Sequence, residues 1–191
     1  MISLFFSMRR LFIALLPNDS TRAELAMICS GINGAKWTPP EQLHCTVRFL
    51  GNVADDRAVE IEAALHEVRM QPLVVRISGV GTFPAADRRA QNVLWVGVET
   101  TPELHELQQR VDDSLEMIGM RRESRPYHAH ITVARIRYAD PIGLEDWLST
   151  HAKHSIAPFT ADQFVLMESS PGADGSDYAV VRRYSTHDGD D

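Results

Sequence analysis

The sequence contains few cysteines and no excess of positive charge. Its two cysteines, Cys29 and Cys45, lie in a helical and a strand pattern, so we expect two buried thiols in a reducing compartment and no disulfide. Acidic residues outnumber basic ones, 26 Asp and Glu against 19 Lys and Arg, giving a formal net charge of −7. A general positive surface for polyanions is therefore excluded, and binding of nucleic acid or phosphate needs a local cluster.

Long apolar segments and flexible linkers are also missing. No apolar run approaches the roughly 20 residues of a membrane span. The apolar start, Met1–Phe6, is short and precedes its arginines, which is not typical of a signal peptide. We therefore expect a cytoplasmic protein without a membrane partner. No Gly/Ser-rich linker divides the 191 residues, so one domain over 1–191 is expected, with 1–8 as a candidate N-terminal extension and 187–191 as a frayed acidic tail.

Strand and helix patterns are mixed along the chain. Apolar runs and period-two alternation predict strands over 11–16, 43–50, 73–80, 92–98, 129–136, 159–168 and 178–184. Helices are expected from capping residues and apolar stripes of helical spacing, beginning at Asp19 or Ser20, at Asp55 or Asp56, at Thr101-Pro102 and near 144–148. This mixture indicates an α+β fold with helices on one side of an antiparallel sheet.

One short pattern occurs twice. Leu43–Val47 reads Leu-His-Cys-Thr-Val and Ala129–Val133 reads Ala-His-Ile-Thr-Val, and the two histidines are 130 − 44 = 86 residues apart. A single His-x-Thr has no significance in a chain of this length. Two copies in predicted strands, half a chain apart, are difficult to attribute to chance.

Strand geometry predicts what these residues share. Side chains alternate between the faces of a strand, so His44 and Thr46 lie on one face, as do His128, His130 and Thr132. One neutral imidazole can take a proton from water while one imidazolium gives a proton to a leaving oxygen. A threonine hydroxyl donates to a phosphate oxygen without adding negative charge. The pattern therefore favours in-line displacement at a phosphodiester.

At these residues the chain resembles the 2H phosphoesterase superfamily, which is defined by two His-x-Thr-x motifs. It is most similar to the bacterial RNA 2′,3′-cyclic phosphodiesterase family, also called 2′-5′ RNA ligases. The resemblance covers most of the chain, and its most specific segment is Arg125–Arg135. It implies a bilobal α+β fold with two pseudo-symmetric halves of antiparallel sheet, helices on the outer face, and a central cleft that carries both motifs.

The resemblance also implies an activity. It implies metal-independent hydrolysis of a 2′,3′-cyclic phosphate at an RNA end to a 2′-phosphate, without a cofactor. We expect the chain to act as a monomer. His44 would be the proton donor and His130 the proton acceptor, with Thr46 and Thr132 on the phosphate. A 5′-hydroxyl in place of water would give reversible 2′-5′ ligation.

Further site residues follow from the same resemblance. Arg135 matches an arginine near the phosphate, although strict alternation places it on the face opposite His130, so a bulge is needed to turn it. Phe12 matches an aromatic that can stack on a base. His128 and Arg125 are further candidate substrate-binding residues.

Three other interpretations stay open. His128, His130 and His44 could form a three-histidine zinc site. The motifs could bind a nucleotide or RNA end without turnover. The substrate of a 2H-type esterase could instead be a small cyclic nucleotide, an ADP-ribose cyclic phosphate or a 2′-5′ oligonucleotide, since the same residues would act on each.

The acidic total hides a local excess of arginine. Segment 121–137 contains five arginines against Glu123, a balance of 5 − 1 = +4 around the second motif. We therefore expect a small basic site for an RNA terminus, and not a long electrostatic track.

Overall fold

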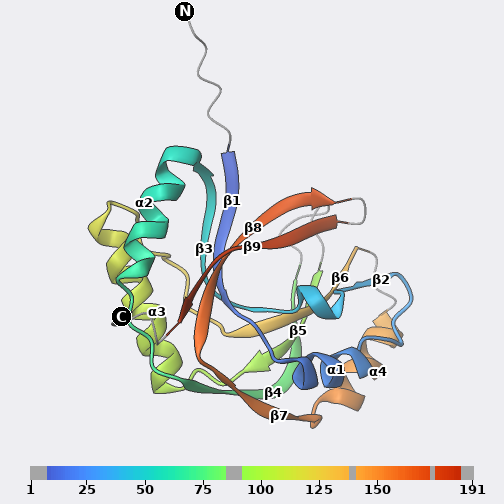
Figure 1. Ribbon diagram of the computed structural model, residues 1–191. Helices are drawn as coiled ribbons and strands as arrows, with labels where there is room; N and C mark the ends of the chain where they lie inside the picture. The colour runs from blue at the N-terminus through green and yellow to red at the C-terminus, as the bar shows by residue number, and fades with distance from the viewer. Residues whose placement is uncertain (1–7, 85–91, 138–140, 173–174, 186–191) are drawn as a thin grey trace, which may run out of the picture.

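The computed structural model describes residues 8–84, 92–137, 141–172 and 175–185 (Figure 1). Within these residues nine strands form one sheet in the order β7-β4-β5-β6-β3-β1-β8-β9, with β2 paired to β6. The strands are β1 (Met8–Leu15), β2 (Ala35–Trp37), β3 (Cys45–Ala54), β4 (Leu73–Phe83), β5 (Asn92–Val98), β6 (His130–Ile136), β7 (Ser155–Ala161), β8 (Gln163–Gly172) and β9 (Gly175–Ser185). Every described pairing is antiparallel. The predicted α+β class is confirmed.

Four α-helices cover one face of this sheet. They are α1 (Asp19–Met27), α2 (Asp55–His66), α3 (Pro102–Met117) and α4 (Pro141–His151). Figure 1 shows α2 and α3 near one end of the sheet and α1 and α4 near the other end. Buried residues of all four helices and of the facing strand positions form one hydrophobic cluster. A second, small cluster of Phe12, Ala14, Val165 and Met167 lies apart from it.

The helix starts differ in part from the sequence prediction. Asn18, and neither Asp19 nor Ser20, caps α1, because its side-chain oxygen accepts the Thr21 amide at 2.9 Å. The α2 helix has no side-chain cap, since its N-cap position is Ala54. Asp55 and Asp56 instead lie in its first turn, where carboxylates favour the positive end of the helix dipole.

The remaining boundaries show what local patterns missed. Thr101 caps α3 and Pro102 follows it, as predicted. The single strand predicted over 159–168 is two strands, β7 and β8, which are separated at Asp162 and lie at different places in the sheet. The three-residue strand β2 was not predicted, because a segment this short carries no periodicity.

Several predictions fall outside the described residues. They are residues 1–7 of the candidate extension and the acidic tail at 187–191. Met8 is the first residue of β1. None of the helices in the described ranges has the length and apolar character needed to cross a membrane.

The order of elements shows an internal repeat. The elements β1–α1–β3–α2 and β5–α3–β6–α4 have the same order of strand and helix, apart from the short β2 within the first set and β4 between the two sets. One His-x-Thr motif lies at the start of β3 and the other at the start of β6. The motif strands β3 and β6 are neighbours at the centre of the sheet, with β1 and β5 on their outer sides. The repeat in sequence therefore corresponds to two halves that meet between the motifs.

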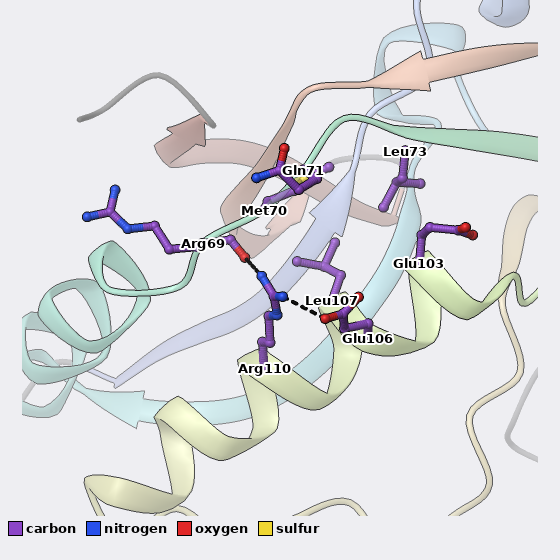
Figure 2. A pocket seen from close by; sticks show the side chains of 8 residues that line it. All are labelled: Arg69, Met70, Gln71, Leu73, Glu103, Glu106, Leu107 and Arg110. Carbon is purple, nitrogen blue, oxygen red and sulfur yellow. Dashed lines mark hydrogen bonds and ion pairs between the residues drawn. The ribbon is translucent and has the colours of Figure 1, made fainter. Parts of the chain in front are cut away.

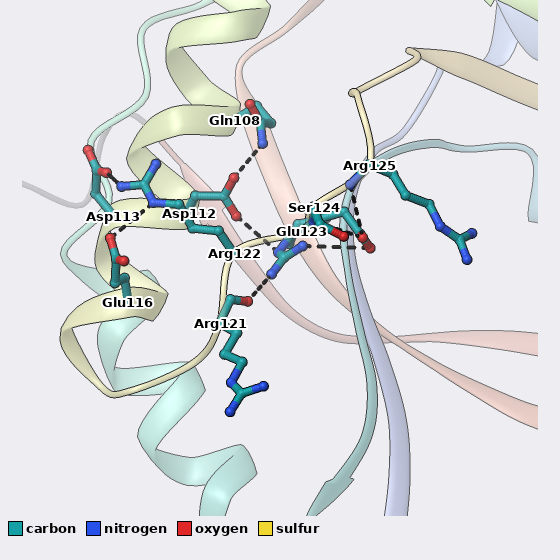
Figure 3. A network of polar contacts seen from close by, with 10 residues as sticks. Gln108, Asp112, Asp113, Glu116, Arg121, Arg122, Glu123, Ser124 and Arg125 are labelled. Atoms are coloured by element: carbon teal, nitrogen blue, oxygen red, sulfur yellow. Dashed lines mark hydrogen bonds and ion pairs between the residues drawn. The ribbon is translucent and has the colours of Figure 1, made fainter.

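A buried ion pair connects the two halves of the protein, from β3 to α3. The Arg48 guanidinium on β3 lies 3.0 Å from the Asp112 carboxylate on α3, and each side chain is only 7% exposed. The same guanidinium donates to the carbonyl of Arg121 at 2.5 Å and lies 3.9 Å from Glu123 (Figure 3). The connection from α3 to β6 is thus attached to the strand that carries the first motif.

We expect Asp112→Ala to lower the free energy of unfolding by about 3–5 kcal/mol, because it leaves the buried Arg48 guanidinium without its main partner. Asp113→Ala is the matched control. Its carboxylate pairs with Arg122 at an exposed position, so the loss should stay below about 1 kcal/mol. Denaturant unfolding of both variants measures the difference, and equal losses would contradict the importance of the buried pair.

Candidate active site

The two motifs meet at the centre of the sheet. Cys45, the middle residue of the first motif, pairs with Ile131, the middle residue of the second. In an antiparallel pair the neighbouring positions run in opposite directions, so this register places His44 across from Thr132 and Thr46 across from His130. All four side chains are half-buried, whereas Cys45 and Ile131 are buried in the main core. The arrangement is two-fold-like about the Cys45–Ile131 pair.

Each imidazole is held by the same local hydrogen bond. Nδ1 of His44 donates to the carbonyl of Gln42 at 2.7 Å, and Nδ1 of His130 donates to the carbonyl of His128 at 2.7 Å. A carbonyl oxygen only accepts, so both Nδ1 atoms carry the proton. In the neutral ring Nε2 is then the free basic nitrogen. In the cation Nε2 carries the proton that can be donated. Both histidines therefore present Nε2 for chemistry.

The surroundings lower the pKa of both imidazoles below 6.5. Burial is the largest cause, because it disfavours the charged ring. The backbone hydrogen bonds raise the pKa of each ring and oppose this effect. For His44 the charges of His130 and Arg135 lower the pKa further, and for His130 the charges of His128 and Arg135 do so. Both rings thus favour the neutral form in the absence of an anion.

A bulge turns Arg135 toward the motif face. Along β6, Thr132 pairs with Trp95 of β5 but Ala134 pairs with Leu94, so Val133 is an extra residue in the strand. Beyond it the alternation is reversed, since Val133 and Ala134 are both buried and Arg135 is exposed. Arg135 therefore shares its face with Thr132 and His130. Its influence on the pKa of both imidazoles agrees with this position.

The first motif carries the same bulge. Thr46 pairs with Ala14 of β1 and Arg48 pairs with Ile13, so Val47 is the extra residue. The residue on the motif face after this bulge is Phe49, which corresponds to Arg135 because 135 − 49 = 86. Phe49 is 57% exposed. Sequence reasoning missed it, because without the bulge strict alternation places residue 49 on the opposite face.

Aromatic rings surround His44. The ring of Phe12 lies 4.9 Å from the imidazole and 6.0 Å from the ring of Phe49. The ring of Tyr178 on β9 also lies 4.9 Å from the imidazole, edge-on. Phe12 itself is only 2% exposed, so its ring supports His44 from within the protein. Phe49 is the most exposed aromatic of this group, since Tyr178 is half-buried.

A second aromatic group surrounds His130. The rings of Phe83, Trp95 and His128 lie 4.9, 6.4 and 6.0 Å from this imidazole. The indole of Trp95 lies across Gly81, where a Cβ would come within 2.3 Å of the ring. Only glycine permits this close approach. His128, a predicted site residue, is exposed and lies 4.9 Å from Trp95.

The arginines before the second motif have different roles. Arg122 forms ion pairs with Asp113 and Glu116 of α3, so its charge is neutralised within the protein. The net charge of +4 counted for segment 121–137 therefore overstates the charge available to a ligand. Arg121 and Arg125 are exposed, and Figure 3 shows their guanidinium groups directed away from this network.

Among the described residues no group of three or more His, Cys, Asp or Glu side chains is arranged to hold a metal ion, so the three-histidine zinc site gains no support.

A small cavity lies elsewhere, between α3 and the segment that enters β4 (Figure 2). Its volume is about 50 Å³, and its lining includes Arg69, Leu73, Glu103 and Arg110. The Arg110 guanidinium crosses it to the carbonyl of Arg69 at 2.8 Å and to Glu106 at 2.6 Å. The cavity is too small for a nucleotide and none of its lining residues belongs to the motifs.

The chain is similar to known proteins over most of its length. A chain named RNA 2′,3′-cyclic phosphodiesterase from Archaeoglobus fulgidus is 34% identical over 176 residues, which cover 91% of this chain and 98% of that protein. One of the same name from Methanocaldococcus jannaschii is 28% identical over 92% and 99% of the two chains. The crystal structure of Escherichia coli LigT complexed with 3′-AMP superposes with a TM-score of 0.74 at 18% identity, covering 95% of this chain and 99% of that one, and so shares the fold.

A family model agrees with the internal repeat as well. The model described as LigT like phosphoesterase matches twice, at residues 15–95 and 96–175, and each match contains one His-x-Thr motif. The two matches together span most of the chain. With its paired motif strands, its two-fold-like histidines and these relatives, the chain belongs to the LigT-like phosphoesterase family.

Proposed function

We propose that this protein hydrolyses RNA ends that carry a 2′,3′-cyclic phosphate, leaving a 2′-phosphate and a free 3′-hydroxyl. The observation that carries the proposal is the pairing of Cys45 with Ile131, which brings both His-x-Thr motifs to one place with Nε2 of each imidazole free. The relatives named RNA 2′,3′-cyclic phosphodiesterase support the substrate class.

The reaction divides between the two imidazoles. The neutral His130 Nε2 takes a proton from water as the water oxygen attacks phosphorus. The bond from phosphorus to the 3′ oxygen breaks on the opposite side, and protonated His44 gives its Nε2 proton to that oxygen. Water enters and the 3′ oxygen leaves in line, so the two imidazoles act from opposite sides of the phosphorus. When a 5′-hydroxyl takes the place of water, its oxygen bonds to phosphorus as the bond to the 3′ oxygen breaks, and the ends are joined through a 2′-5′ bond. The reverse of this step re-forms the cyclic phosphate and releases the 5′-hydroxyl.

The phosphate oxygens that do not react need donors without negative charge. Thr46 and Thr132 supply hydroxyls, each across the junction from the other motif's imidazole. Arg135 supplies a guanidinium, whose planar fork suits two phosphate oxygens. These groups stabilise the charge that the phosphoryl group carries in the transition state. The proposed chemistry needs neither a metal nor a cofactor.

The positions of the two histidines indicate on which side of the phosphate the terminal nucleoside lies. The leaving 3′ oxygen belongs to the nucleoside of the RNA end, which therefore lies on the His44 side. Phe49 is the most exposed aromatic ring near His44, and the buried ring of Phe12 packs against the His44 imidazole. We propose that Phe49 stacks on the terminal base, while His128 and Arg125 remain candidate contacts to the adjoining RNA.

Phe49→Ala is expected to raise KM for a cyclic-phosphate-ended oligonucleotide about tenfold with little change in kcat, because stacking on one base contributes about 1–3 kcal/mol. Phe49→Tyr, which keeps the ring, is the control and should retain the wild-type KM. Steady-state kinetics on both variants test the assignment. An alanine variant with wild-type KM would remove Phe49 from the base site.

The pH profile of kcat/KM is expected to be bell-shaped with its maximum below pH 6.5, because one imidazole must be protonated and the other neutral while the pKa of each is lowered below 6.5. Above pH 6.5 the cationic form of His44 disappears and kcat/KM falls. A bound phosphate anion raises the pKa of His44, so the alkaline limb of kcat should lie at higher pH than that of kcat/KM. A plateau of kcat/KM up to pH 8 would contradict this assignment.

The direct test uses an oligoribonucleotide ending in a 2′,3′-cyclic phosphate, with the product analysed by mass and by the position of its phosphate. We expect a 2′-phosphate product, and turnover that survives a strong chelator. Comparison of kcat/KM with that for a mononucleotide 2′,3′-cyclic phosphate separates RNA ends from small cyclic nucleotides. Absence of any turnover of either substrate by the wild-type protein would overturn the proposal and leave a binding role.

The setting of the enzyme is part of the same proposal. Cys29 and Cys45 are both free thiols, which supports a reducing cytoplasm. One chain carries both motifs, so a monomer is sufficient for activity. Residues 1–191 would then act as one bilobal domain.

A further inference from the structure

The junction between the two halves of the sheet is short. The strands β1 and β3 pair along most of their lengths, and so do β5 and β6. The two motif strands β3 and β6, in contrast, share one paired position, Cys45 with Ile131. A single pair leaves strands free to open and twist about it. The separation of the two imidazoles therefore needs contacts other than the ladder.

Tyr127 spans this junction. It lies three residues before His130, and its hydroxyl donates to the carbonyl of Thr46 in the other motif at 3.1 Å. This hydrogen bond thus joins the first motif to the segment that leads into the second.

The ring of Tyr127 also fixes where this contact lies. It is half-buried and packs against the main hydrophobic core, which is on the helix side of the sheet. The imidazoles lie on the other side with Phe12. The hydroxyl therefore cannot reach a substrate bound at the imidazoles, and any effect it has on the reaction passes through Thr46 and His130.

We propose that Tyr127 is a positioning residue, whose hydroxyl holds the second motif at the separation from the first that one phosphate requires. The effect of Tyr127 on turnover rests on the proposed function, but the hydrogen bond from Tyr127 to Thr46 is present without substrate. Catalytic groups on two strands must stay within a fraction of an ångström of the productive arrangement, since a shift of about 1 Å can cost roughly 100-fold in rate.

The first test is Tyr127→Phe, which removes only the hydroxyl. We expect kcat to fall about tenfold with KM changed less than twofold, because the binding groups stay present while their alignment is relaxed. Tyr184→Phe is the matched control. Its hydroxyl also donates to a backbone carbonyl, that of Glu62 at 3.4 Å, but on α2, away from the motifs. Loss of kcat in both variants, in proportion to their loss of stability, would overturn the inference.

The second test needs no turnover. NMR titration gives the pKa of His44 in the wild-type protein and in His130→Ala, and again with Tyr127→Phe present in both. Removing His130 should raise the pKa of His44, because its charge lowers that pKa in the native arrangement. The rise should be smaller with Tyr127→Phe, since the two rings are then less closely held.

The two outcomes separate the inference from the proposed function. An equal rise in both backgrounds would show that Tyr127 does not set the separation of the rings, and would overturn the inference whatever the substrate is. A wild-type protein that hydrolyses no cyclic phosphate would overturn the function, and the titration would still decide the role of Tyr127.

Discussion

Replacing either His44 or His130 with alanine is expected to lower kcat for hydrolysis of a cyclic-phosphate-ended RNA by about 10²–10⁴-fold, the range typical of general acid or base catalysis. Each variant keeps the other imidazole, both threonines and Arg135, so binding of the RNA end should persist. Kinetics together with binding of a 2′-phosphate product measure the two effects. Loss of turnover with retained binding also separates an enzyme from a binding module.

The pH profile assigns the two roles. A general acid must be protonated, so activity that depends on it falls as pH rises, and His44→Ala should lose the alkaline limb of kcat/KM. A general base must be neutral, so His130→Ala should lose the acidic limb. The control is His66→Ala at the end of α2, an exposed residue that should leave the profile unchanged. Loss of the opposite limbs would reverse the assignment.

Replacing Arg135 with glutamine is expected to lower kcat/KM about 100-fold, because a hydrogen-bonded charge on the phosphate contributes about 1.5–3 kcal/mol. The same change should move the bell toward higher pH. The charge of Arg135 lowers the pKa of both imidazoles, so removing it raises both. Steady-state kinetics across pH measure the two effects in one experiment.

Two further variants separate charge from shape at this position. Arg135→Lys keeps the charge and loses the planar fork, so the bell should stay in place while kcat/KM falls in part. Arg110→Gln removes one charge from the exposed ion pair with Glu106 on α3, and should change neither quantity. A shifted bell in Arg110→Gln would show that net charge alone governs the titration.

Much of the site follows from residue periodicity. Alternation along a strand places His44 with Thr46 and His130 with Thr132 on one face, and the structure has them there, half-buried and without exception on the side away from the helices. The mixture of apolar runs and helical stripes was sufficient for the α+β class. Both results depend only on local geometry, in which each residue's direction is fixed by its neighbours in the chain.

The exceptions share a physical cause. Strict alternation places Arg135 on the face opposite His130, and the bulge that its proposed role requires is present at Val133 because the register with β5 and β2 is set by strands distant in sequence. A bulge at Val47 likewise brings Phe49 to the motif face, and the residues of the first motif alone do not predict it. A bulge has no marker in the residues that form it.

Tertiary packing also decided which candidate residues are available to a ligand. The resemblance implies a base-stacking role for Phe12, yet the cluster with Val165 and Met167 buries this ring and leaves Phe49 exposed. Arg122 reads as part of a basic patch, yet Asp113 and Glu116 neutralise it. Burial and pairing depend on elements that meet only in the folded sheet, so composition cannot predict them.

The sequence by itself determined the two motifs, their faces and the class of fold, since these depend on the period of a strand and of a helix. The tertiary structure alone decided that the motif strands are neighbours, that they pair at Cys45 and Ile131, and that Tyr127 and Arg48 bridge the halves. Strand order and register are set by packing the whole sheet against one core, and this is a property of contacts between residues far apart in the chain.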